Sequence, residues 1–151
     1  MELQLMRTAR PAMLAASIVL TACATPAPTS DAPAGSLYAR LGGPPVMTQV
    51  VTRTIERAAH DPRTQRSFDG IKLATVQASI VQQICSISGG GCKYEGETMA
   101  KSHKDHKIRA GEFDALVDIL REEMDAAQVD TGAKNELLKL LAPMKRDIVA
   151  G

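Results

Sequence analysis

Residues 89–103 read Gly-Gly-Gly-Cys-Lys-Tyr-Glu-Gly-Glu-Thr-Met-Ala-Lys-Ser-His, and this stretch determines how we interpret the rest of the chain. Its glycines predict a loop, because glycine adopts backbone conformations that other residues avoid. The residues after the loop predict a short helix that ends at His103. Met99 lies four positions before this histidine, so on a helix the two side chains share one face.

A histidine that shares a helix face with an apolar thioether is a candidate ligand for a haem iron, because a neutral imidazole nitrogen binds iron well. A single histidine without a second ligand motif is more often a surface residue, so this segment alone leaves both interpretations open. The chain has no Cys-x-x-Cys-His motif, which excludes covalent attachment of a c-type haem.

The composition favours one helical domain and gives no sign of a nucleic-acid partner. The chain has 151 residues, a formal net charge of +1 and 3% aromatic residues, with no tryptophan. A core built from Leu, Ile, Val, Met and Ala suits helices packed on helices. The sequence shows no basic stripe with interleaved aromatic residues, so binding to nucleic acid is not indicated.

The first 22 residues predict a lipoprotein signal peptide. Two arginines precede a short apolar run at 11–20, which is too short to span a bilayer as a mature helix. Leu-Thr-Ala-Cys at 20–23 resembles a bacterial lipobox, in which Cys23 becomes the lipid-modified first residue of the mature protein. An ordinary cleavable signal peptide is the alternative. Ala24 stands where aspartate would be the inner-membrane signal, so the resemblance to Gram-negative lipoproteins indicates the outer membrane, facing the periplasm.

Residues 23–35 are rich in proline and alanine and have no apolar periodicity, so they predict a semi-extended tether. We expect ordered structure to begin near Ser36. The predicted organisation is therefore a signal peptide at 1–22, a tether at 23–35 and one folded domain at 36–151.

Apolar residues at helical spacing predict that this domain is all-α. A brief helical turn at 36–41 is broken by Gly-Gly-Pro-Pro at 42–45, and Gly132 should separate the last two helices. His60 ends one helix, where we interpret it as a cation near the helix carboxyl end rather than a ligand. The four longer helices are predicted at 46–59, 73–87, 113–124 and 137–148.

Cys85 and Cys92 remain once Cys23 is assigned to the lipid anchor. They flank a flexible loop in a chain predicted to be exported, so they are a candidate disulfide. Two reduced thiols or a metal-binding pair are the alternatives, although no further Cys or His stands at zinc-ligand spacing.

Taken together, these segments resemble one known family, the truncated (two-over-two) haemoglobins of the first group. The resemblance runs from Ser36 to about Val149 and implies an all-α truncated globin domain, a two-over-two sandwich of helices. The matching segments follow the family's order: Ser-Leu-Tyr-x-Arg-Leu-Gly-Gly at 36–43, Asp-Pro-Arg at 61–63 with Phe68 and Gly70, Gly-Gly at 89–90 with Tyr94, Gly96, Met99, Ser102 and His103, and Phe-Asp-x-Leu-Val at 113–117.

The resemblance also implies a b-type haem between the helix that carries Val76 and Ile80 and the helix that carries His103. His103 would be the proximal iron ligand, and Phe68 would pack on the porphyrin face. Tyr94 and Met99 would line the edge of the haem.

His106 is a competing ligand, since it lies three residues after His103 near the same helical face. It sits in the charged run Lys-Asp-His-Lys at 104–107, where the family has an apolar residue, so we favour His103. Three nearby lysines could contact the haem propionates: Lys101, Lys104 and Lys107. For at least two of the three, a solvated helix face is the simpler interpretation.

The distal side departs most from the family, which usually places a tyrosine and a glutamine there to hydrogen-bond oxygen. The matching positions are Ile55 and Ile80, and Val76 matches the position directly over the iron. Each missing hydrogen bond lowers the binding free energy of oxygen by about 1–3 kcal/mol. We therefore expect oxygen to bind weakly, to dissociate rapidly and to oxidise the iron readily. Carbon monoxide and nitric oxide depend less on a donor, so we expect them to bind comparatively well. Gln77 or Thr54 could restore a donor by turning toward the pocket.

The function implied by the resemblance is binding of oxygen, nitric oxide or carbon monoxide at the cell envelope, with transport, sensing and detoxification all open. Nitric oxide dioxygenation is an alternative side activity that would need an electron donor, and the donor-free pocket argues against it. The sequence contains no nucleophile triad, carboxylate dyad or phosphate loop, so we expect a binding protein rather than an enzyme. A haem-free helical lipoprotein that acts as an interaction module is the second hypothesis.

Overall fold

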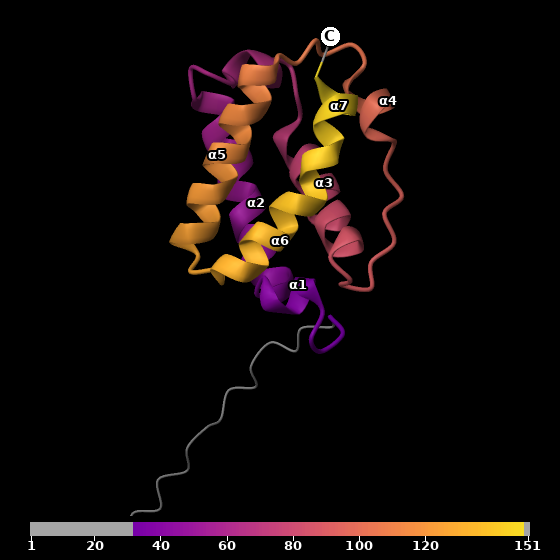
Figure 1. Cartoon of the computed structure of the whole chain (residues 1–151). Helices are drawn as coiled ribbons and strands as arrows, with labels where there is room; N and C mark the ends of the chain where they lie inside the picture. Colours follow the sequence, from indigo (N-terminus) through magenta and orange to yellow (C-terminus); the bar gives the residue numbers. More distant parts are fainter. Residues whose placement is uncertain (1–31, 150–151) are drawn as a thin grey trace, which may run out of the picture.

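α2 (Gly43–His60) and α3 (Leu73–Ile87) pack against each other and form one layer of the molecule (Figure 1). α5 (Ala110–Ala126) lies against α2 and forms the second layer with the column made by α6 (Thr131–Leu141) and α7 (Lys145–Ile148). The predicted all-α class and its two-over-two arrangement are confirmed. The remaining elements are short: α1 (Leu37–Arg40), the 3-10 helix η1 (Gln65–Phe68), α4 (Met99–His103) and the 3-10 helix η2 (Ala142–Met144).

The computed structural model describes residues 32–149. The predicted signal peptide and its lipidation site Cys23 lie outside the described residues. Ala32 packs against the core, and the backbone N–H of Ser36 donates to the carbonyl of Pro33 at 3.1 Å. The folded domain therefore includes the last residues of the predicted tether. None of the helices within residues 32–149 is both long enough and apolar enough to cross a membrane.

The core lies between the two layers. The apolar side chains of α2 recur every three to four residues and so face α3 and α5 together. Burying each large aliphatic side chain stabilises the fold by about 1.5–3 kcal/mol. The largest side chains that are almost fully buried include Tyr38, Leu41, Met47, Ile55, Ile84, Ile119, Met124 and Leu137.

α2 begins at Gly43, three residues before the position predicted from the apolar pattern. Proline is tolerated in the first turn of a helix, where its missing N–H would have no partner, so Pro44 and Pro45 start this helix rather than delay it. Gly42 caps the helix at φ 95°, and a Cβ atom there would lie 2.5 Å from the side chain of Val46. Only glycine fits this position.

The carboxyl-terminal helix predicted at 137–148 is divided into α6, η2 and α7. Pro143 cannot donate a backbone hydrogen bond, so the chain tightens into a 3-10 turn at this point. The prediction that Gly132 separates the last two helices is wrong, because this glycine lies in the first turn of α6. The separation falls earlier, where the Asp130 side chain accepts from the N–H of Ala133 and begins the helix.

The start of the described chain and α4 lie at opposite ends of the molecule. In Figure 1 the chain enters beside α1 at the bottom, whereas α4 and the end of α7 lie at the top. α4 packs against α7, so the short helix that ends at His103 is held at this upper end.

Candidate functional site

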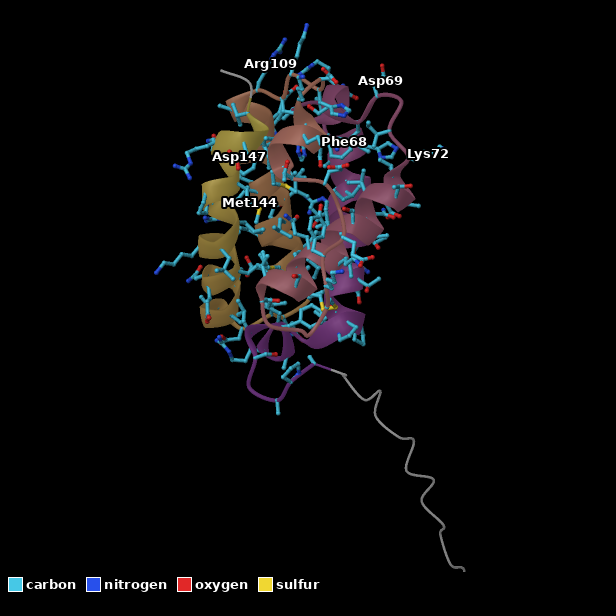
Figure 2. The ribbon with its side chains drawn as sticks, turned by 90° about the vertical axis from the view of Figure 1, so that its right-hand side faces the viewer. Phe68, Asp69, Lys72, Arg109, Met144 and Asp147 are labelled. Carbon is cyan, nitrogen blue, oxygen red and sulfur yellow. A yellow bond between two sulfur atoms is a disulfide. The ribbon has the colours of Figure 1, made fainter. Side chains whose placement is uncertain are left out.

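An apolar cavity of about 390 Å³ lies among α2, α3, α4 and α5. A cavity of this size with mostly apolar walls is typical of sites for small molecules and cofactors. Figure 2 shows the wall residue Phe68 toward the end of the molecule that carries Arg109, and the wall residue Met144 on the flank formed by α6 and α7. The wall includes all the residues predicted to bind a cofactor: Ile55, Phe68, Val76, Ile80, Tyr94, Met99 and His103.

Several elements bring these side chains together. Ile55 comes from α2 and Phe68 from η1, and Val76 and Ile80 stand one turn apart on α3. The hydroxyl of Tyr94 donates to the carbonyl of Glu97 at 3.2 Å, which holds the ring against the loop before α4. α4 then contributes Met99 and His103.

One hydrogen bond orients the imidazole of His103. Its Nδ1 atom lies 2.8 Å from the carbonyl oxygen of Met99, one turn earlier on α4. A carbonyl can only accept, so Nδ1 carries the hydrogen and Nε2 keeps its lone pair. Histidines that bind a metal are usually held in this way, because the second bond fixes both the tautomer and the ring plane. His103 is therefore prepared to act as a ligand.

His106 also lies in the cavity wall but is less constrained than His103. Its backbone N–H donates to the carbonyl of His103 at 3.1 Å, and its side chain is exposed to solvent. Among residues 32–149 no hydrogen bond fixes its ring. The geometry therefore favours His103 over His106 as the oriented ligand.

Within the part of the chain that the structure describes, no group of three or more His, Cys, Asp or Glu side chains could hold a metal ion by itself. A single imidazole can hold an iron only when the other ligands come from elsewhere. A porphyrin supplies its own nitrogen ligands, and its flat apolar faces suit a cavity with this lining. The residues present therefore fit a haem.

Comparison with known protein families shows which family this chain belongs to. A family model described as bacterial-like globin matches residues 36–150. The chain belongs to the bacterial-like globin family. Two curated relatives of this globin are group 1 truncated haemoglobins. The one from Mycolicibacterium paratuberculosis is 26% identical over 116 residues and covers 77% of this chain and 85% of its own length. The one from Synechocystis is 27% identical over 124 residues and covers 76% of this chain and 97% of its own length.

Solved structures of truncated haemoglobins share the fold of this globin. The Fe(III) form of the protein from Tetrahymena pyriformis matches with a TM-score of 0.72 at 22% identity, over 77% of this chain and 99% of that chain. THB1 from Chlamydomonas reinhardtii matches with a TM-score of 0.64 at 26% identity, over 80% of this chain and 100% of that chain. The truncated globin fold predicted from the sequence is thus confirmed.

The residues predicted to lie on the distal side form a largely apolar part of the wall. Ile55, Val76 and Ile80 carry no hydrogen-bond donor, and all three line the cavity. Gln77 is turned away from it: its Nε2 atom donates to the carbonyl of Thr52 at 3.4 Å, and it is absent from the lining residues. Thr54, the second residue that could restore a donor, does line the cavity.

The lysines near α4 differ in their contacts. Lys101 donates to the Glu97 carboxylate at 2.6 Å, so it already has an acidic partner. Lys104 and Lys107 are exposed and form no ion pair within residues 32–149, which leaves them available to an anion at the rim of the cavity.

A disulfide joins Cys85, the buried residue after Ile84 in α3, to Cys92 in the loop before α4. The bridge fixes the start of the segment that carries Tyr94 against the end of α3. Gly90 lies inside this loop, where a Cβ atom would meet the Tyr38 ring at 2.5 Å and the sulfur of Cys85 at 2.6 Å. The absence of a side chain at this position is what lets the loop approach the core.

Sequence reasoning missed an ion pair at the cavity, between the wall residue Glu112 and Arg66, which lies outside the wall. Glu112 is 8% exposed, and both its carboxylate oxygens accept from Arg66, at 2.8 and 2.6 Å. One of them also accepts from the backbone N–H of Arg109 at 2.7 Å and so caps α5. The Arg66 guanidinium holds the pKa of Glu112 below its ordinary value. A glutamate three residues after the N-cap residue Arg109 was the only local signal for this site.

Proposed function

We propose that this globin holds a b-type haem in the cavity and binds diatomic gases there, as a member of the oxygen-binding and oxygen-transport class. The haem iron would supply the coordination position at which oxygen, nitric oxide or carbon monoxide binds. The observation that carries the proposal is the imidazole of His103 in the wall of an apolar cavity, with Nδ1 held by Met99. Membership of the globin family supports the same conclusion.

Each side chain has a defined task in this proposal. Nε2 of His103 would ligate the iron, because Nδ1 already donates to a backbone carbonyl. Phe68 would pack on one porphyrin face, and Tyr94 and Met99 would contact its edge. The aliphatic wall would keep water out, which strengthens the ligand bond to the iron relative to competing solvent.

The distal wall would set the preference among gases. Ile55, Val76 and Ile80 give a ligand no N–H or O–H to accept from. Oxygen gains most from such a donor, because it carries negative charge when it binds iron, whereas carbon monoxide depends on it less. A deficit of about 1–3 kcal/mol corresponds to roughly 5- to 150-fold faster release of oxygen than in a pocket with a strong donor.

Absorption spectroscopy of the purified full chain with added haem tests the proposal. We expect an intense Soret band in the wild type, and its loss or a much faster transfer of haem to a scavenger protein in His103→Ala. His106→Ala is the matched control, and it should keep both the band and the haem. A colourless wild type, or firm haem binding in His103→Ala, would contradict the proposal and favour a haem-free interaction module.

We also propose that the mature protein is a lipoprotein of the cell envelope that faces the periplasm. The lipobox-like sequence before Cys23 supports this location, and so does the Cys85–Cys92 disulfide, since disulfides persist in oxidising compartments. Cys23→Ser should move the protein from the membrane fraction to the soluble fraction. An unchanged distribution between the fractions would argue against the anchor.

A further inference from the structure

The short helix that carries His103 depends on its flanking segments for its position. α4 packs against α7, but none of its five residues is buried. A helix this short is unstable without support from the rest of the protein. Before α4, the Cys85–Cys92 disulfide fixes the loop to α3. The position of the imidazole therefore also depends on what holds the chain after α4.

A single guanidinium holds the chain that follows α4. Arg66 lies in η1, and its Nη2 atom donates to the carbonyl of Lys107 at 3.0 Å. Its Nε and Nη2 atoms also donate to the Glu112 carboxylate, at 2.8 and 2.6 Å. Arginine suits this task because its planar group presents several N–H donors in a fixed fork. Lys107 lies between α4 and α5 and Glu112 in the first turn of α5, so Arg66 holds this connection at two points.

The backbone of Lys107 has a conformation that lysine rarely adopts. Its φ angle is 48°, in the left-handed region, and residues other than glycine stay there only where the surrounding structure holds them. The hydrogen bond from Arg66 to the Lys107 carbonyl supplies such a constraint. The next residue, Ile108, lines the cavity and forms a bridge with Val149. The turn at Lys107 thus returns the chain after His103 to the cavity wall.

The same guanidinium belongs to the element that carries Phe68. Arg66 and Phe68 are two residues apart in the four-residue helix η1. Phe68 lines the cavity, whereas Arg66 does not and has a side chain that is 45% exposed. Figure 2 shows Phe68 and Arg109, the N-cap residue of α5, toward the same end of the molecule. The Arg66 hydrogen bonds therefore connect the segment with Phe68 to the segment that follows His103, from outside the cavity.

We propose that Arg66 is a positioning residue that limits how fast haem leaves the cavity. The inference rests on the proposed haem function and adds to it a residue that lies outside the cavity wall. By joining η1 to the connection after α4, Arg66 keeps the Phe68 and His103 sides of the site at a fixed spacing. When its hydrogen bonds are removed, the two segments separate more readily and the cofactor is held less firmly.

Arg57 offers a closely matched control. Its guanidinium pairs with Glu123 at 2.6 Å, which equals the shorter distance between Arg66 and Glu112. The Arg57 and Arg66 side chains are 46% and 45% exposed, and those of Glu123 and Glu112 are 7% and 9% exposed. Arg57 joins α2 to α5, and neither it nor Glu123 lines the cavity. The two ion pairs should therefore stabilise the fold similarly, whereas only the pair with Arg66 should affect haem retention.

The test compares Arg66→Lys with Arg57→Lys in the haem-loaded full chain and measures transfer of haem to a scavenger protein. Lysine keeps the positive charge but lacks the fork that reaches both the Glu112 carboxylate and the Lys107 carbonyl. Arg66→Lys should lose haem roughly fivefold faster than the wild type, because it loses hydrogen bonds to the connection after α4. Arg57→Lys should lose haem at the wild-type rate.

Hydrogen exchange of the haem-free protein gives a second readout. The backbone N–H groups of His106 and Arg109 donate to the His103 carbonyl and to the Glu112 carboxylate. Both amides should exchange faster in Arg66→Lys, because the segment after α4 loses its contact with η1. In Arg57→Lys both should exchange at the wild-type rate.

Glu112→Gln and Glu123→Gln form an independent pair of variants, and the first should lose haem faster than the second. Equal haem loss within both pairs of variants, with an intact Soret band in the wild type, would overturn this inference alone. Unchanged exchange of the His106 and Arg109 amides in Arg66→Lys would also overturn it. A colourless wild type would overturn the proposed function together with the inference.

Discussion

The guanidinium of Arg66 and the carboxylate of Glu112 form a two-bond ion pair at the edge of the cavity, with N···O distances of 2.8 and 2.6 Å. Arg66 belongs to η1, which also carries Phe68, and Glu112 lies in the first turn of α5. The pair therefore ties the segment that would face one side of a porphyrin to the helix beyond it.

Glu112→Gln should lower the free energy of unfolding by about 1–2 kcal/mol at neutral pH, because the nearly buried carboxylate loses its charge-assisted bonds to Arg66, whose own side chain is 45% exposed and partly screened by solvent. The pKa of Glu112 is lowered in the folded state from its ordinary value of 4.5, so its contribution is present above that pH and is lost as the pH falls below it. Chemical denaturation between pH 7 and pH 3 should show a flatter profile for the variant than for the wild type.

Glu122→Gln is the control for this prediction. Glu122 pairs with Arg57 at 2.6 Å, but its side chain is 60% exposed. Solvent-exposed ion pairs contribute about 1 kcal/mol or less. An equal loss of stability in both variants would mean that burial beside the cavity gives Glu112 no special role.

Ile55→Tyr should slow the release of oxygen from the haem-loaded protein. The new hydroxyl would stand in the distal wall, where Ile55 now presents only methyl and methylene groups. A gained hydrogen bond of about 1–3 kcal/mol predicts roughly 5- to 150-fold slower dissociation, measured by stopped flow. Ile55→Phe adds the ring without the hydroxyl and should not reproduce the effect. No difference between the two variants would show that Ile55 does not lie over the ligand.

Removal of the disulfide by Cys85→Ala and Cys92→Ala should destabilise the domain by about 2–3 kcal/mol, because the short loop between them becomes free in the unfolded chain. Denaturant titration measures the loss, and treatment of the wild type with a reductant should match it. The reductant should have no further effect on the double variant. Equal stability of the oxidised and reduced wild type would contradict the prediction.

Gly90→Ala should destabilise the domain by about 1–3 kcal/mol, because the added methyl group would overlap the Tyr38 ring and the sulfur of Cys85. Gly111→Ala is the control: a Cβ atom there meets nothing within 4 Å, and alanine favours the first turn of α5. The melting temperature should therefore fall in Gly90→Ala and stay the same or rise in Gly111→Ala. A neutral Gly90→Ala would show that the loop can move away from the core.

Helical spacing in the sequence was enough to predict the longer helices, whereas the role of His103 as a proximal ligand was predicted from the resemblance to truncated haemoglobins. Met99 and His103 stand one helical turn apart, and that spacing alone places the carbonyl of one beside the ring of the other. Errors occurred where backbone chemistry competes with the apolar pattern, at Pro44 and Pro143, since the pattern does not show where a missing N–H is tolerated.

Contacts between distant segments could not be predicted in this way. Arg66 and Glu112 are 46 residues apart, and Gln83 and Met144 are 61 residues apart. Whether Gln77 or Thr54 faces the cavity depends on the rotation of two helices about their own axes as they pack together. That rotation is set by every side chain in the interface, not by the spacing within either helix.

The sequence by itself determined the all-α class and the histidine on the short helix after the glycine loop, because each depends on residues within a few turns of one another, whereas the distal positions were predicted from the resemblance to truncated haemoglobins. Only the tertiary structure decided that seven predicted residues share one cavity and that Glu112 in its wall is paired with Arg66. The physical reason is that burial and hydrogen bonding of a side chain depend on neighbours that the fold, rather than the order of the chain, brings to it.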